Sequence, residues 1–486
     1  MTDARARVAA WLVVAVYAAG LSAGLLTIPV QVTDSLIPIL QAQDAPSWRA
    51  AVLSSADSAG YLRPLRIGQI QWLFDVAGGR YFAVFRGFHV CLAVACLALF
   101  AAAVRVRRAT DVWALAFGLT VLTGLHTFLG TVWEAYPINH FLEVVVACLF
   151  VYVLAESKGG WWADALTALT FLVAALTLES GLLVWVVVAV AWWCGAPGVS
   201  RRGLVLLTVL LAGYAAIRFG YSTGLPTLVE RSTGFGTERL DPVELTRRFG
   251  DRPFVLYAYN VVSSMGSVLA SQPRAGVWTI LAEAREGGLT PGTLMNVAVS
   301  LLTTAALALW AVRRWTVPGG TALGWTAWRP RRCERGDRAV VIAAVLVVAN
   351  AVLSYGYTKD EIMSVAGAFY ALAVTEAARS WLAERADGRA GASAASGPTR
   401  LALLAVLLAV SGGWAVRAVG LHYQVHQMAH DVRNEWVTVD AWLEQQRATP
   451  STDRGRRLVG ALRDDALARV AGNPWGLALQ GTRVFR

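Results

Sequence analysis

The sequence predicts an all-α membrane protein, a bundle of about eleven transmembrane helices, on three observations. Of its 486 residues, 56% are hydrophobic and only 15% are charged, with a mean hydropathy of +0.51. Apolar runs recur along the chain at about 17–25 residues each, the length that crosses a bilayer as a helix. These runs are continuously apolar, whereas strands of a transmembrane barrel would alternate.

The first span is expected to be an uncleaved helix, because its apolar stretch is long for a signal peptide and lacks a small-x-small cleavage site. The expected spans are 8–29, 81–104, 111–130, 138–155, 161–178, 181–194, 204–220, 294–312, 339–355, 362–378 and 401–419. The moderately apolar segment 254–269 is expected to lie along the membrane interface. A twelfth span there is the alternative, and it would invert everything downstream.

The net charge of +11 follows from topology rather than from nucleic-acid binding. Arginines gather in alternate loops, as the positive-inside rule requires, so we expect the N-terminus inside and the C-terminus outside. Lysine occurs only at Lys158 and Lys359, and Ala, Val and Leu are abundant. This composition is typical of a GC-rich bacterial genome and indicates a multi-pass protein of the bacterial cytoplasmic membrane.

Two units are expected. Residues 1–420 form the transmembrane domain, with a first outer loop at 30–80 and a second long outer loop at 221–291. Residues 421–486 form a small helical tail outside the membrane. In this tail, just past the last span, His422, His426 and His430 recur every fourth residue, which indicates one face of a helix. Three helical turns spread these rings too far apart for one tetrahedral ion, so we interpret them as part of an amphipathic helix.

The first outer loop carries the main candidate site residues. Asp34 follows the first span and suits a general base that activates an acceptor hydroxyl; capping a short loop helix that starts at Ser35 is the equal alternative. Arg63 and Arg66 flank the rigid Pro64 and suit bidentate binding of phosphate oxygens. Snorkelling of both arginines to lipid headgroups is the simpler interpretation.

Two further charged turns are expected on the same face. Glu179 lies between two spans that are short for a bilayer, which favours a turn that dips toward a cavity. Lys359 is the only lysine expected outside and suits neutralisation of a leaving phosphate; an ordinary helix start explains this turn equally well. Within the spans, Arg86, His89, His126, Glu143 and Arg218 are costly in lipid and are candidates for the same polar site.

Three short motifs resemble the C-type (GT-C) membrane glycosyltransferases. They are Thr33-Asp34-Ser35, Tyr61-Leu62-Arg63-Pro64-Leu65 and Leu178-Glu179-Ser180-Gly181. In that superfamily an acidic residue stands in the first outer loop, an Arg-Pro-Leu stretch often follows, and a Lys-Glu-Ser turn recurs between middle helices. Here the turn lacks the lysine. Many relatives also carry two adjacent acids where Asp34 is followed by Ser35, so Asp44 and Asp57 remain alternative bases.

The resemblance implies a polyprenyl-phosphate-sugar-dependent, mannosyltransferase-like enzyme that transfers the sugar with inversion on the outer face of the membrane. Asp34 would be the base, Asp57, Arg63, Arg66, Glu179 and Lys359 would bind or shape the substrate site, and the acceptor would be a glycan, lipid or protein. The sequence is compatible with a reaction that uses a divalent cation and with one that does not. The alternatives are an outer-face polysaccharide polymerase or ligase with a lipid diphosphate donor, a transporter or flippase for a lipid-linked sugar, and a non-catalytic scaffold.

Overall fold

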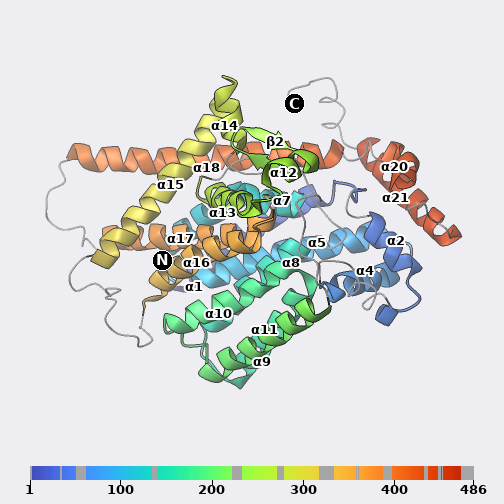
Figure 1. The fold of residues 1–486 in the computed structure, drawn as a ribbon. Coiled ribbons are helices and arrows are strands. Elements are labelled where there is room, and N and C mark those ends of the chain that lie inside the picture. Colours follow the sequence, from blue (N-terminus) through green and yellow to red (C-terminus); the bar gives the residue numbers. More distant parts are fainter. Residues whose placement is uncertain are drawn as a thin grey trace.

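A computed structural model shows a bundle of long helices that run side by side across Figure 1. The structure describes residues 3–32, 36–50, 62–133, 139–221, 233–270, 278–316, 333–356, 358, 361–386, 397–431, 436–446, 450 and 452–471. The predicted all-α class is confirmed, since the strands described are the short pair β1 (Thr233–Phe235) and β2 (Glu238–Leu240), which form an antiparallel hairpin.

Each predicted apolar run coincides with an α-helix or, for the run 111–130, with two, although the helix ends differ from the predicted ends in most of them. The helices are α1 (Asp3–Leu25), α2 (Leu36–Asp44), α4 (Pro64–Ala77), α5 (Tyr81–Val104), α6 (Ala109–Gly124), α7 (His126–Trp133), α8 (His140–Ala155), α9 (Trp161–Thr177), η1 (Glu179–Leu182), α10 (Leu183–Trp193), α11 (Arg201–Tyr221), α12 (Pro242–Phe249), α13 (Pro253–Leu269), α14 (Trp278–Arg285), α15 (Pro291–Thr316), α16 (Arg335–Leu353), η3 (Glu361–Met363), α17 (Ser364–Ala386), α18 (Gly397–Asp431), α20 (Val439–Gln445) and α21 (Asp453–Ala471).

Six helices in the described part of the chain are long and apolar enough to cross a membrane. They span Asp3–Leu25, Tyr81–Val104, Arg201–Gly220, Pro291–Trp315, Arg335–Leu353 and Glu361–Ala383. A seventh span results if α6 and α7, which meet at a bend of 69°, are counted as one. Helices α8, α9 and α13 and the η1–α10 segment are apolar but shorter. The chain is therefore a multi-pass membrane protein.

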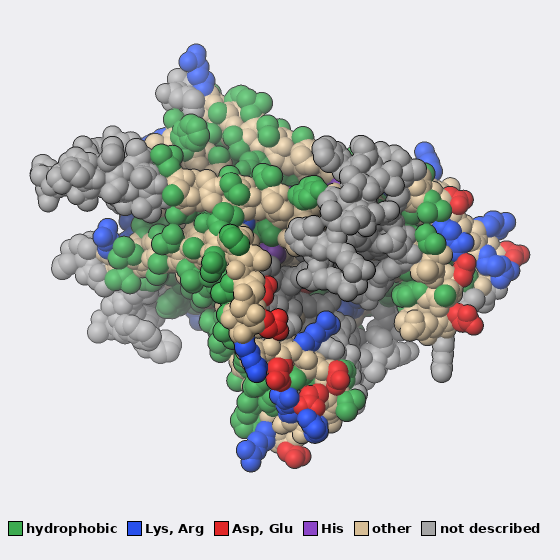
Figure 2. Space-filling model, turned by 90° about the horizontal axis from the view of Figure 1, so that it is seen from above, with side chains coloured by type: hydrophobic (Ala, Val, Ile, Leu, Met, Phe, Trp, Pro, Cys, Tyr) green, Lys and Arg blue, Asp and Glu red, His purple; other side chains and the backbone are tan. Residues whose placement is uncertain are grey.

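Large apolar side chains cover the outside of the bundle. Val16 on α1, Val209 on α11 and Leu302 on α15 are each more than half exposed. Figure 2 shows hydrophobic side chains over the middle of one face, while charged side chains gather at the right-hand end and at the lower edge of the view. A contiguous apolar surface of this kind requires an apolar surrounding, which lipid supplies.

Helix α17 is the central element of the bundle, and its membrane-spanning window is 94% buried. Its small residues allow close approach of neighbouring helices. A Cβ atom at Gly367 would lie 2.2 Å from Thr127 Oγ1, and Thr375 Oγ1 occupies the space beside Gly118 of α6. Because lipid gives little hydrophobic drive for helix association, such close packing is what holds helices together in a membrane.

Two buried arginines stabilise helix ends. Arg417 of α18 donates to the carbonyl oxygen of Gly124 at the bend between α6 and α7 and to that of Asn296, at 2.9 and 2.8 Å. Arg86 of α5 donates to the carbonyl oxygens of Ile28 and Pro29, just after α1. Carbonyls at a helix end have no partner within the helix, and leaving them unpaired in lipid costs several kcal/mol.

The bundle has two chemically different ends. The "basic end" contains the end of α8 and the start of α16, which Glu156 and Arg338 join through an ion pair. The "loop end" contains the start of α4 and the turn after α9, which Arg63 and Glu179 join. Helix α8 runs from the loop end to the basic end, and its 16 residues separate the two by about 24 Å at 1.5 Å per residue.

The C-terminal helices α20 and α21 pack on α2 and α4 at the loop end. Apolar residues of α2, α4, α20 and α21 form one cluster that includes Ile39, Phe74 and Leu462. Trp436 donates to the carbonyl oxygen of Val30 at 2.8 Å, and the guanidinium of Arg469 lies 3.0 Å from the centre of the Phe82 ring. The described part of the expected tail is thus helical and covers the predicted site region (Figure 1).

Helix α13 occupies the segment expected along the interface. It begins at Pro253, and the Asn260 side chain donates to the carbonyl oxygen of Tyr355 at 3.0 Å. This contact ties α13 to the end of α16. Its position relative to a membrane surface stays a prediction.

Candidate functional site

Three of the six predicted site residues lie in the described structure. Arg63, Arg66 and Glu179 are at the loop end, whereas Asp34, Asp57 and Lys359 lie outside the described residues. The alternative base Asp44 ends α2, and this helix begins at Leu36, two positions after Asp34 in the sequence.

The Arg63–Glu179 ion pair is the centre of the site. The Nε atom of Arg63 lies 2.8 Å and its Nη2 atom 2.5 Å from Oε2 of Glu179, and Nε also lies 3.1 Å from Oε1. The two side chains are 21% and 27% exposed. The pair joins residues 116 positions apart in the sequence. A forked arrangement of this kind fixes the plane of the guanidinium as well as its charge.

Local sequence positions both partners. Pro64 is the first residue of α4, where its missing N–H and fixed φ suit a helix start, and Arg63 is the residue just before it. On the other side, Leu178 has an extended backbone (φ −155°, ψ 144°) that ends α9. Glu179 then opens the short 3₁₀ turn η1, so its carboxylate projects at the reversal between α9 and α10.

Gly181 allows this reversal to pack against α9, and its replacement by alanine is expected to disrupt the site. A Cβ atom there would lie 2.2 Å from the carbonyl carbon and oxygen of Ala174, which are backbone atoms that cannot turn aside. We expect Gly181→Ala to lower the thermal midpoint and to displace Glu179 from Arg63.

The midpoint of the purified protein in detergent measures this effect, with Gly213→Ala as the control, because a Cβ at Gly213 meets no atom within 4 Å. Equal midpoints for the two variants would contradict the packing.

Other polar side chains surround the ion pair and form the "loop-end cluster". It consists of Arg63, Arg66, Gln69, His140, Glu143, Glu179, Ser180 and Tyr214. The charges of Arg66 and Arg63 act on His140, and Gln69 lies beside Glu143. Tyr214 of α11 lies within electrostatic range of Glu179 and Arg63.

Several atoms of the loop-end cluster are buried without a hydrogen-bond partner among the described residues. They are Oε1 of Gln69, both ring nitrogens of His140, Oε2 of Glu143, Oγ of Ser180 and the hydroxyl of Tyr214. Buried polar groups in native proteins are nearly always paired, and exceptions call for a ligand or bound water. Five such residues around one ion pair therefore indicate a site that a polar ligand completes.

Arg86 and His89, which were expected in this site, and two histidines of the C-terminal tail make contacts within the fold instead. Arg86 pairs with backbone carbonyls, and the Asn139 amide lies 3.1 Å from Nε2 of His89. Nδ1 of His422 accepts from the Trp133 indole at 3.0 Å, and Nε2 of His426 lies 2.8 Å from Thr27 Oγ1. These contacts agree with the interpretation of the histidines as a helix face.

A second charged region at the basic end was not foreseen as a site. A cavity of about 390 Å³ opens between α5, α6, α15, α16 and α17. It is lined by Arg105, Arg107, Arg108, Asp111, Trp310, Arg314, Glu334, Arg335, Gly336, Glu376, Arg379, Ser380 and Ala383. The arginines were assigned to topology alone. The signal that could have found the cavity is the presence of Asp111, Glu334 and Glu376 in or beside otherwise basic segments.

Among the described residues, no group of three or more His, Cys, Asp or Glu side chains could hold a metal ion.

The fold and the loop-end cluster define a class: a multi-pass helical membrane protein with a polar, arginine-containing site at one end of its bundle. No protein-family model matches the chain, and neither a curated protein nor a solved structure was found to be similar to it.

Proposed function

We propose that the protein is a membrane glycosyltransferase that moves a sugar from a polyprenyl-phosphate donor to a glycan, lipid or protein acceptor. The observation that carries the proposal is the Arg63–Glu179 ion pair, set beside Arg66 and five residues whose buried polar atoms have no hydrogen-bond partner in the described part of the chain. A phosphate-linked sugar needs such a place, with fixed positive charge for the phosphate and polar groups for the sugar hydroxyls.

The reaction assigns a role to each part of the cluster. Asp34 accepts the proton of the acceptor hydroxyl, whose oxygen attacks the anomeric carbon of the sugar. The bond from that carbon to the phosphate oxygen breaks with inversion, and the polyprenyl phosphate leaves with the bonding electrons. Arg66 and Arg63 stabilise the charge on the leaving phosphate, while Glu179 holds Arg63 in place. Asp57 and Lys359 complete the substrate site in this proposal.

The proposed topology places the loop end outside the cell and the basic end in the cytoplasm. The arginines at the ends of α5, α15 and α17 and at the starts of α11 and α16 support this orientation. In this proposal the chain crosses the membrane eleven times, and α8, α9 and the η1–α10 segment cross as short helices within the bundle. Eleven crossings also place the loop end outside and the basic end in the cytoplasm. A polyprenyl-phosphate sugar presented at the outer leaflet then meets the loop-end cluster directly.

Cysteine labelling tests this orientation. In a chain whose own five cysteines are replaced, we expect Arg457→Cys on α21 to react with a membrane-impermeant maleimide in intact cells. Arg202→Cys at the start of α11 is exposed as well, and we expect it to react only after the membrane is opened. The reverse pattern would place the loop end in the cytoplasm and remove the outer-face proposal.

A transfer assay tests the function. Membranes that contain the protein are supplied with a polyprenyl-phosphate sugar labelled in the sugar, and both labelled product and released polyprenyl phosphate are measured. We expect both to appear. Turnover of a diphosphate-linked donor alone would favour the polymerase or ligase, and movement of intact donor across the membrane without cleavage would favour a transporter.

A further inference from the structure

The cavity at the basic end carries an excess of positive charge that its own carboxylates do not balance. Six arginines and three carboxylates line it. Arg314 pairs with Asp337 and Glu334, and Arg379 lies 2.6 Å from Oε2 of Glu376. Asp111 accepts the backbone N–H groups of Arg107 and Arg108 at 2.8 and 2.9 Å, so its carboxylate caps the start of α6.

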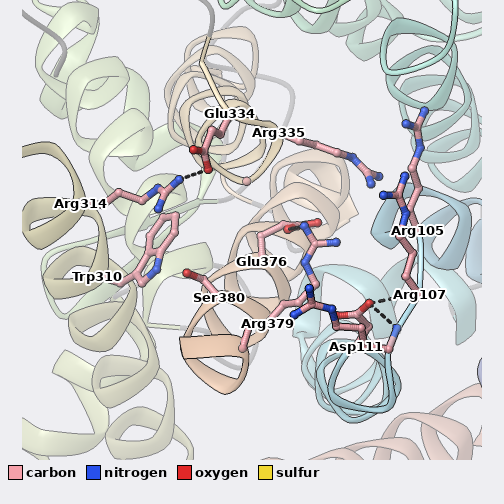
Figure 3. A pocket seen from close by; sticks show the side chains of 13 residues that line it. Arg105, Arg107, Asp111, Trp310, Arg314, Glu334, Arg335, Glu376, Arg379 and Ser380 are labelled. Atoms are coloured by element: carbon pink, nitrogen blue, oxygen red, sulfur yellow. Dashed lines mark hydrogen bonds and ion pairs between the residues drawn. The ribbon is translucent and has the colours of Figure 1, made fainter. Parts of the chain in front are cut away.

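Arg335 is the cavity residue whose polar atoms are least satisfied. Its Nε and Nη2 atoms are buried and have no hydrogen-bond partner among the described residues. The nearest carboxylate oxygen is Oε2 of Glu156, 3.6 Å from Nε, and Glu156 already accepts two short bonds from Arg338. Figure 3 shows the Arg335 guanidinium pointing across the cavity toward the segment that carries Arg105 and Arg107.

Arg105 faces this same charge. Partial burial lowers the pKa of Arg105, and the nearby positive charge of Arg335 lowers it further. Its side chain donates to the carbonyl oxygen of Glu156. Two like charges therefore meet at one wall of the cavity, an arrangement that an anion between them would stabilise.

The backbone of Arg105 adds a separate observation. Its φ is +53°, and it is the one residue other than glycine with positive φ in the described part of the chain. This position follows the end of α5, where glycine is the usual residue because a Cβ atom disfavours the left-handed conformation. Arg105 adopts this unfavourable backbone conformation, and its guanidinium lines the cavity wall.

We propose that this cavity binds a phosphate-bearing anion, held between Arg335 and Arg105 at one wall of the cavity. Its volume of about 390 Å³ is within the range of small-ligand sites and exceeds the needs of a single phosphate. Arginine forks match phosphate oxygens in geometry and charge. The ligand is a soluble diphosphate or the headgroup of an anionic phospholipid, because the basic end meets both water and the membrane surface. The site is separate from the loop-end cluster, so it does not depend on the proposed transfer.

Anion binding to the purified full-length protein in detergent tests the proposal, with pyrophosphate as the soluble probe and short-chain phosphatidate as the lipid probe. Short-chain phosphatidylcholine, whose headgroup has no net charge, serves as the reference. We expect at least one of the two anions to bind, and loss of charged hydrogen bonds in Arg335→Gln or Arg105→Gln to weaken that binding about 10- to 100-fold. Arg335→Lys, which retains the charge, is expected to weaken it less.

Arg313→Gln is the matched control, because Arg313 is exposed on α15 beside Arg314 and does not line the cavity. Unchanged binding in this variant, with the elution volume of each variant equal to wild type, supports the proposal. Pyrophosphate binding identifies a soluble ligand, and phosphatidate binding alone identifies a headgroup. The proposal is overturned if neither anion binds, if Arg313→Gln weakens binding as much as Arg335→Gln, or if Arg66→Gln abolishes it while Arg335→Gln does not.

Discussion

Replacing Glu179 with glutamine is expected to destabilise the loop end and to reduce sugar transfer. The carboxylate accepts a forked pair of bonds from Arg63, and both side chains are less than a third exposed. Hydrogen bonds to charged groups contribute about 1.5–3 kcal/mol, and we expect a loss of that order in the free energy of unfolding. Transfer is expected to fall by more than the loss of folded protein, because the freed Arg63 no longer holds its orientation toward the phosphate.

A double-mutant cycle separates the pair from its surroundings. Arg63→Gln and Glu179→Gln are measured alone and together in detergent-solubilised protein, and the double variant is expected to lose less stability than the sum of the single variants. Glu444→Gln on α20 is the control, since Glu444 is exposed and has no ion pair described. Strict additivity of the two substitutions would show that the contact contributes nothing to stability.

Replacing Glu156 with glutamine is expected to have the largest effect on stability. Glu156 and Arg338 are almost fully buried at the basic end, and Nε and Nη2 of Arg338 lie 2.6 and 2.7 Å from the two carboxylate oxygens. Removing the negative charge leaves Arg338, with Arg335 beside it, uncompensated. Breaking a buried pair in this way costs about 3–5 kcal/mol.

The thermal midpoint and the denaturant dependence of Glu156→Gln measure this cost. Glu238→Gln is the matched control, because Glu238 pairs with Arg248 at 3.0 Å in a setting where both side chains are more than a third exposed. Such surface pairs contribute about 0–1 kcal/mol. A loss in Glu156→Gln no larger than in Glu238→Gln would refute the role of this pair in the fold.

The fold class could be predicted because the bilayer imposes a simple rule on sequence. A helix in lipid must be mostly apolar, so residues 90–104 of α5 and 339–349 of α16 appear as uninterrupted apolar runs. The bend between α6 and α7 could not be predicted in this way. It depends on Arg417, nearly 300 residues away in the chain, which satisfies the carbonyl of Gly124.

The candidate site could be predicted in part. Pro64 and the turn at Glu179 both indicated shaped backbone, and the structure brings Arg63 and Glu179 together. The ion pair between them was not predicted, because each residue was assigned a separate role toward a substrate. The cavity around Arg335 was not predicted, because the arginines in the loops were interpreted only as markers of topology. The positive-inside rule explains such arginines without reference to their neighbours.

The most direct test of the central claim is transfer by Asp34→Asn beside wild type, with the labelled polyprenyl-phosphate sugar in membranes that contain equal amounts of protein. Asparagine keeps the size of the side chain and removes the base, which contributes about 10²–10⁴-fold in rate. We expect wild type to form labelled product, Asp34→Asn to lose at least about 100-fold of that rate, and Asp44→Asn to retain it. Equal product from wild type and Asp34→Asn would contradict the role of Asp34 as the base, and no product from wild type would contradict the proposed glycosyltransferase.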